Sequence, residues 1–215
     1  MLSLRDFPRF PVLLEAVIDA FCTFLRTLKP TLEACVLHSV AWGVEWPRRK
    51  TILNDKDLID YDADRNNEKE HNSEYEYECL DGVQQVMRAL RAEHLGIGDV
   101  IVIRKEYEVL LKALSEEHGT SSSERLARSG VVITGHPGTG KTAFLIYLLL
   151  LRLSRQQPTA LQLNPEGYYI FDHRGVTYHT SDTYGYDDRM RACWALVDYN
   201  ATSLGRVPRC VAREG

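Results

Sequence analysis

Paired cysteine motifs are missing from this 215-residue chain. Its five cysteines are scattered and form no C-x-x-C or Cys/His pattern: Cys22, Cys35, Cys79, Cys193 and Cys210. The spacing gives no indication of a zinc site. We therefore expect reduced thiols in an intracellular protein.

Long uninterrupted apolar runs are missing as well. The most apolar N-terminal segment, 12–25, is interrupted by Glu15 and Asp19. It is therefore predicted to be neither a signal peptide nor a membrane span. Without a targeting signal we expect a cytoplasmic or nuclear protein with no membrane partner.

A strong charge of one sign is also absent, because 26 Lys and Arg face 30 Asp and Glu, for a net charge of −4. This balance gives no general attraction to nucleic acid or acidic membranes. An EF-hand loop, a G-x-S-x-G nucleophile motif and an N-K-x-D guanine-reading motif are not found either. Because of the charge balance, the sequence does not indicate nucleic acid binding.

One glycine-rich motif is present. Residues 135–142 read GHPGTGKT and fit the Walker A pattern G-x-x-x-x-G-K-[ST] at every fixed position. The β-branched run 131–134 predicts a buried strand before it, and the apolar segment 143–153 predicts a helix after it. Strand, glycine loop and helix together form a cradle for nucleotide phosphates. The predicted binding residues are Gly135, His136, Pro137, Gly138, Thr139, Gly140, Lys141 and Thr142.

The residue types in this loop match the chemistry of a nucleoside triphosphate. Glycines let the backbone approach phosphate oxygens without a Cβ in the way. Lys141, the one candidate catalytic residue, is expected to reach the β- and γ-phosphates as a compact charge. The hydroxyl of Thr142 is expected to ligate Mg²⁺. The predicted cofactors are ATP and Mg²⁺.

A second candidate metal ligand follows the apolar run 193–197. Asp198 stands at the end of this predicted strand, which is the Walker B arrangement. In a parallel sheet this carboxylate and the phosphate loop emerge at the same edge. Thr142 and Asp198 are therefore the predicted Mg²⁺ ligands.

Three regions are predicted along the chain. Apolar residues at helical spacing indicate a helical N-terminal region, 1–53, that forms a hairpin with its own small core. Segment 54–81 holds eleven acids against three bases. Since such a segment repels itself, we expect a flexible acidic linker. The nucleotide-binding domain is predicted to span 82–215, with its core in 130–200.

The motif resembles a known group of proteins. GHPGTGKT is similar to the G-x-P-G-T-G-K-T loop of AAA-type P-loop ATPases. The longer stretch 135–163, with YYIFD at 168–172 and WALVD at 194–198, resembles fungal P-loop NTPase-like proteins related to the Crinkler and retrotransposon hot-spot groups. The resemblance implies an ATP-binding α/β fold: a three-layer α/β/α domain with a mostly parallel sheet, preceded by a variable N-terminal region.

Two departures from that family bear on hydrolysis. Tyr199 stands where AAA-type enzymes usually carry a catalytic glutamate. Only 17 residues (215 − 198) follow Asp198, so we expect a C-terminally incomplete domain without a sensor strand or arginine finger. Binding rests mostly on the loop, whereas hydrolysis needs a positioned water. The sequence therefore predicts ATP binding, with weak or no hydrolysis in this chain alone.

Two alternatives remain open. One is a GTPase-like P-loop protein, because the run 172–175, DHRG, matches the D-x-x-G switch of GTPases. A non-enzymatic nucleotide sensor or scaffold is the other, with the N-terminal helices binding a protein partner.

Overall fold

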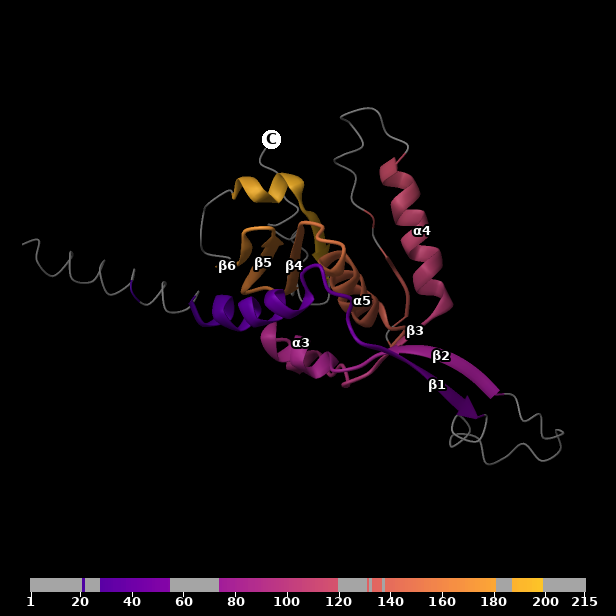
Figure 1. The fold of residues 1–215 in the computed structure, drawn as a ribbon. Helices are drawn as coiled ribbons and strands as arrows, with labels where there is room; N and C mark the ends of the chain where they lie inside the picture. The colour runs from indigo at the N-terminus through magenta and orange to yellow at the C-terminus, as the bar shows by residue number, and fades with distance from the viewer. Residues whose placement is uncertain are drawn as a thin grey trace, which may run out of the picture.

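The structure is a computed structural model that describes residues 21, 28–54, 74–119, 131, 133–136, 138–180 and 187–198. Figure 1 shows the arrangement of its helices and strands. Residues 28–41 are helical. The other elements, in chain order, are β1 (Arg48–Asn54), β2 (Glu74–Leu80), α3 (Val83–Ala89), η2 (Glu93–Leu95), β3 (Ile101–Ile103), α4 (Lys105–Gly119), α5 (Lys141–Ser154), β4 (Thr159–Asn164), β5 (Gly167–Asp172), β6 (Gly175–Thr180), η4 (Asp188–Ala192) and β7 (Trp194–Val197).

The strands form two sheets. One has the order β1-β2-β3 and is antiparallel throughout. The other has the order β6-β5-β4-β7, in which only β4 and β7 run parallel. The predicted helix 143–153 and the predicted strand 193–197 are confirmed by α5 and β7. The run 160–163 also predicts a strand, and the runs 168–171 and 176–179 predict a hairpin across the turn 172–175. Strand β4 and the β5–β6 pair confirm both.

The predicted mostly parallel, three-layer α/β/α fold is wrong. Strands β5 and β6 are joined by a two-residue turn, since Asp172 pairs with Gly175, and so short a connection makes them antiparallel. The strand predicted over 131–134 is also absent from the described residues of that segment. Val131 and Ile133 are exposed and belong to neither sheet.

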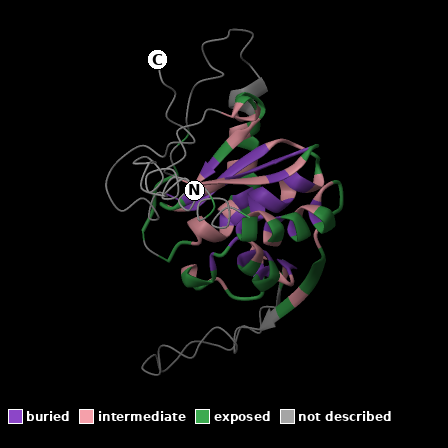
Figure 2. Ribbon diagram, turned by 90° about the vertical axis from the view of Figure 1, so that its left-hand side faces the viewer, coloured by how far each residue is buried: buried purple, intermediate pink, exposed green. Residues whose placement is uncertain are grey.

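The helical segment 28–41 does not form a core of its own. Its buried residues Ala34, Leu37 and Ala41, which follow the buried Pro30, belong to one hydrophobic cluster with residues of α3, α5 and the four-stranded sheet. Figure 2 shows the buried residues gathered where the helices cover this sheet. The predicted helices before residue 28 lie outside the described residues, apart from residue 21. Their binding of a protein partner stays a prediction.

The structure places two strands near the predicted region boundaries. Strand β1 lies at the end of the predicted helical region 1–53, and β2 occupies the last part of the predicted linker 54–81. Residues 55–73 lie outside the described part of the chain. Cations of β1 lie opposite acids of β2 and the residue that follows it: Arg48–Glu78 at 3.4 Å, Lys50–Glu76 at 2.8 Å and Arg49–Asp81 at 2.8 Å. A local count of charge misses this pairing, because the compensating cations precede the acidic segment.

Within the described residues, no helix combines the length and the apolar character needed to cross a membrane.

Candidate functional site

The phosphate loop ends at the first residue of α5. Gly140, which precedes the helix, has φ 82°, and Gly138 has φ 78°. Both lie in the left-handed region that favours glycine. A Cβ on Gly140 would also lie 3.0 Å from the hydroxyl of Tyr107. Gly138 and Gly140 therefore meet a conformational requirement of the loop.

Helix α5 presents its N-terminus at this loop. Its first hydrogen bond runs from Phe144 N–H to the carbonyl of Gly140, at 2.9 Å. The amides of the first helical turn have no carbonyl partner within the helix, and the helix dipole adds positive potential there. An anion placed against Lys141 and Thr142 meets several donors at once.

The Lys141 ammonium lies across the loop. Its Nζ donates to the carbonyl oxygens of Gly135 and His136, at 2.9 Å and 2.7 Å, and lies 3.4 Å from Thr139 Oγ1. These acceptors are uncharged and exposed. Since hydrogen bonds from an ammonium to a charged oxygen are roughly twice as strong, a phosphate competes well for this side chain.

The two predicted metal ligands meet in the structure. Thr142 Oγ1 donates to Asp198 Oδ2 at 2.7 Å, across 56 positions of sequence. Asp198 is 8% exposed, and its N–H donates to the carbonyl of Gln162 at 3.0 Å. The parallel pairing of β7 with β4 thus brings the carboxylate to the start of α5. A hydroxyl and a carboxylate oxygen are the donor types that suit Mg²⁺.

No group of three or more His, Cys, Asp or Glu side chains suited to a metal is found among the described residues. Mg²⁺ usually binds through one or two protein oxygens, with waters and substrate phosphates completing its octahedron. The Thr142–Asp198 pair fits that pattern.

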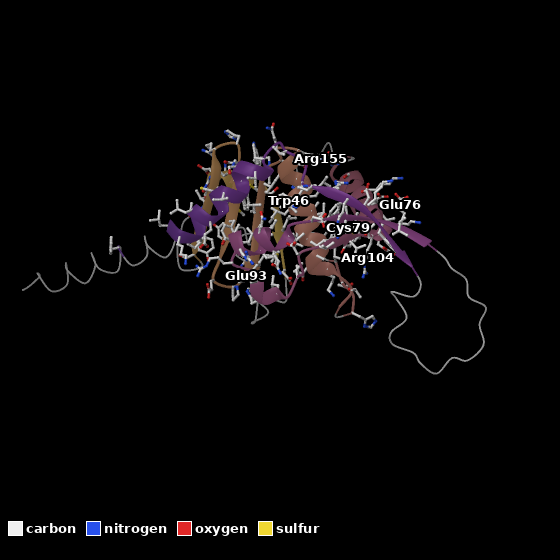
Figure 3. The ribbon with its side chains drawn as sticks, turned by 60° about the horizontal axis from the view of Figure 1, so that its bottom comes forward. Trp46, Glu76, Cys79, Glu93, Arg104 and Arg155 are labelled. Atoms are coloured by element: carbon white, nitrogen blue, oxygen red, sulfur yellow. The ribbon has the colours of Figure 1, made fainter. Side chains whose placement is uncertain are left out.

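Two residues of the site have no signal in the sequence motif. Arg104 Nη1 donates to the carbonyl of Thr139 at 3.3 Å, and the hydroxyl of Tyr107 donates to the carbonyl of Gly140 at 3.2 Å. Both come from the junction of β3 and α4, and Figure 3 shows Arg104 beside the start of α5. Tyr107 belongs to a stripe of apolar residues at helical spacing, with Leu110, Leu111 and Leu114, and this stripe predicts only a core position for it. Its contact with the loop depends on how α4 packs on α5.

Burial raises the pKa of Tyr107, because a phenolate is poorly solvated there. The side chain is 4% exposed. Its hydroxyl therefore stays protonated and remains a donor at neutral pH.

The D-x-x-G run lies at the other end of the four-stranded sheet. Asp172 follows Phe171, which pairs with the first residue of β4, whereas Asp198 follows Val197, which pairs with Gln162 further along β4. The carboxylate of Asp172 accepts from Arg174 N–H at 2.8 Å and lies 3.8 Å from Arg189 Nη1. The side chain thus stabilises the hairpin turn, and no observation links it to the phosphate loop.

Pro137 of the motif and Tyr199 after Asp198 lie outside the described residues. Comparisons of the chain with protein-family models, with curated proteins and with solved structures find no match.

Proposed function

We propose that the chain binds Mg·ATP through the loop 135–142, with weak or no hydrolysis by this chain alone. The single observation that carries the proposal is the Thr142–Asp198 contact at 2.7 Å, directly beside the Walker A loop. It joins two residues that the sequence predicts as metal ligands from separate patterns. A glycine turn with no role in phosphate binding would give no reason for a buried carboxylate beside the first turn of the helix.

Each residue has a distinct task in this proposal. The amides at the start of α5 and Lys141 hold the phosphates, while Thr142 and Asp198 hold the cation. When bound, Mg²⁺ neutralises charge on the β- and γ-phosphate oxygens. Lys141 exchanges its bonds to the carbonyls of Gly135 and His136 for charged phosphate oxygens. Adenine is favoured over guanine by the similarity of GHPGTGKT to AAA-type loops, and Tyr199 in place of a glutamate argues for slow turnover.

The test is a titration of the full chain with a fluorescent ATP analogue and Mg²⁺, followed by competition with ATP, GTP, ADP and AMP. We expect saturable binding that ATP and ADP displace, and that AMP displaces far less well because it lacks the β-phosphate. Absence of saturable binding would overturn the proposal, as would equal displacement by AMP and ATP. GTP as the stronger competitor would overturn the assignment of adenine.

The metal assignment predicts a specific loss in Asp198→Asn. The carboxylate is expected to hold Mg²⁺ directly or through water. In the variant, the factor by which Mg²⁺ raises the affinity for ATP is therefore expected to be about ten-fold smaller than in wild type. Binding in excess EDTA should change little. The measurement is the ratio of dissociation constants with and without Mg²⁺.

The matched control is Asp188→Asn, which removes one carboxylate from the exposed side of η4. It should leave the ratio unchanged. An Asp198→Asn chain that keeps the full Mg²⁺ dependence would remove Asp198 from the metal site.

A further inference from the structure

We propose that Arg104 and Tyr107 are positioning residues, which hold two consecutive peptide groups of the phosphate loop from outside and turn their N–H groups toward the phosphates. This inference rests on the proposed function of the loop. It identifies which part of the chain before the Walker A motif prepares the loop to bind.

The contacts concern adjacent peptide groups. Arg104 donates to the carbonyl of Thr139, and Tyr107 donates to the carbonyl of Gly140. No cis peptide bond occurs in the described residues, and in a trans peptide the C=O and the following N–H point in opposite directions. Fixing those carbonyls on the outer side therefore directs the N–H groups of Gly140 and Lys141 to the inner side. Amides of this part of the loop are the donors that a Walker A motif offers to phosphate.

The backbones of the two donor residues are joined by a hydrogen bond. Arg104 immediately precedes α4, and Tyr107 N–H donates to the carbonyl of Arg104 at 3.0 Å. The Tyr107 ring packs on Phe144 and Tyr147 of α5, with centroid distances of 5.1 Å and 5.5 Å. The core thus fixes the ring, and its hydroxyl reaches the loop from that fixed position.

The contact of Tyr107 is additional to the helix's own bonding. The carbonyl of Gly140 already accepts from Phe144 N–H at 2.9 Å, and a carbonyl oxygen has two lone pairs. The helix alone therefore satisfies this group, so a hydroxyl aimed at it from another helix adds orientation. Arg104 adds a positive charge that polarises the Thr139 peptide and strengthens the N–H of Gly140 as a donor.

This arrangement links the loop to the three-stranded sheet. Arg104 directly follows β3, the edge strand that pairs with β2. The region before the Walker A motif then takes part in nucleotide binding, although none of its residues belongs to the motif.

The test compares Mg·ATP affinity and backbone order in four full-length chains: wild type, Tyr107→Phe, Arg104→Gln and the control Lys105→Gln. Tyr107→Phe keeps the packed ring and loses only the hydroxyl, so its fold is retained. We expect about a 5-fold loss of affinity in Tyr107→Phe and about a 10-fold loss in Arg104→Gln. Lys105→Gln, which removes a neighbouring exposed cation, should bind within two-fold of wild type by titration calorimetry.

Two readouts separate positioning from a general loss of structure. The midpoint of thermal unfolding of each variant should stay within about 2 °C of the wild-type value. The ¹⁵N order parameters of residues 139–141 should fall in Tyr107→Phe and Arg104→Gln without nucleotide, while those of α4 stay unchanged. A fifth chain, Arg104→Lys, keeps a cationic donor and should recover part of the affinity that Arg104→Gln loses.

The outcomes separate this inference from the proposed function. If wild type binds Mg·ATP and both variants bind it equally well, the positioning role is overturned and the proposed function stands. If wild type itself binds no nucleotide, the proposed function is overturned, and so is the role of Arg104 and Tyr107 in phosphate binding. An affinity loss in Lys105→Gln equal to that in Arg104→Gln would show a general charge effect and would also overturn the inference.

Discussion

Replacing Lys141 with alanine is expected to lower the affinity for Mg·ATP by about 100-fold. Lys141 is the only lysine or arginine of the motif, and its ammonium lies across the loop, where it donates to the carbonyls of Gly135 and His136. Bonds from an ammonium to phosphate oxygens contribute about 1.5–3 kcal/mol each, and a 100-fold loss corresponds to about 2.8 kcal/mol. Titration calorimetry with Mg·ATP measures the change directly.

The stability of the folded chain should hardly change in Lys141→Ala. The carbonyls that lose their donor are exposed, so water replaces the ammonium. Thermal unfolding in the absence of nucleotide checks this expectation. It also shows that a loss of affinity does not come from unfolding.

Helix α4 offers a matched control, because Lys105 is the first residue of that helix as Lys141 is the first residue of α5. Lys105→Ala removes the same charge from the same helical position, but from a residue outside the motif. It should bind Mg·ATP within about two-fold of wild type. Wild-type affinity in Lys141→Ala would contradict the assignment of the loop as a phosphate site.

Gly167→Ala is expected to destabilise the chain by about 3 kcal/mol. A Cβ at this position would lie 2.2 Å from the carbonyl oxygen of His179 and 2.6 Å from the hydroxyl of Tyr178. The carbonyl belongs to the backbone of β6, so it moves only if the pairing of β5 with β6 changes. For a chain of this length, the change corresponds to a fall of about 6–12 °C in the midpoint of thermal unfolding.

Gly98→Ala is the control for this substitution. A Cβ there meets nothing within 4 Å, and Gly98 is not among the residues with positive φ. We expect no loss of stability, and a gain of up to about 1 kcal/mol from lower freedom of the unfolded chain. Equal unfolding temperatures for Gly167→Ala and Gly98→Ala would contradict the close approach of β5 and β6 at Gly167.

Local patterns in the sequence determined several elements. The apolar segment after GHPGTGKT predicts α5, and the turn residues between two β-rich runs predict the β5–β6 hairpin. The apolar run before Asp198 predicts β7. These elements follow from side-chain periodicity and turn chemistry within a few residues, and the candidate phosphate and metal ligands lie at their ends.

Tertiary structure alone decided which segments pair. The sequence predicts a linker where β2 pairs with β1, because the cations that lie opposite its acids, from Arg48 to Lys50, belong to another part of the chain. The family resemblance implies a mostly parallel sheet, and this expectation is wrong because β5 pairs antiparallel with both β4 and β6. Strand order and direction depend on contacts between distant residues, which periodicity does not report.

The site shows the same division. The motif itself names Lys141 and Thr142, since a phosphate loop needs its residues close together in sequence. The hydrogen bond between Thr142 and Asp198 exists only because β7 runs parallel to β4 beneath the start of α5. The contacts of Arg104 and Tyr107 with the loop likewise depend on the packing of α4 against α5, because nothing in a local pattern specifies which peptide a distant side chain will reach.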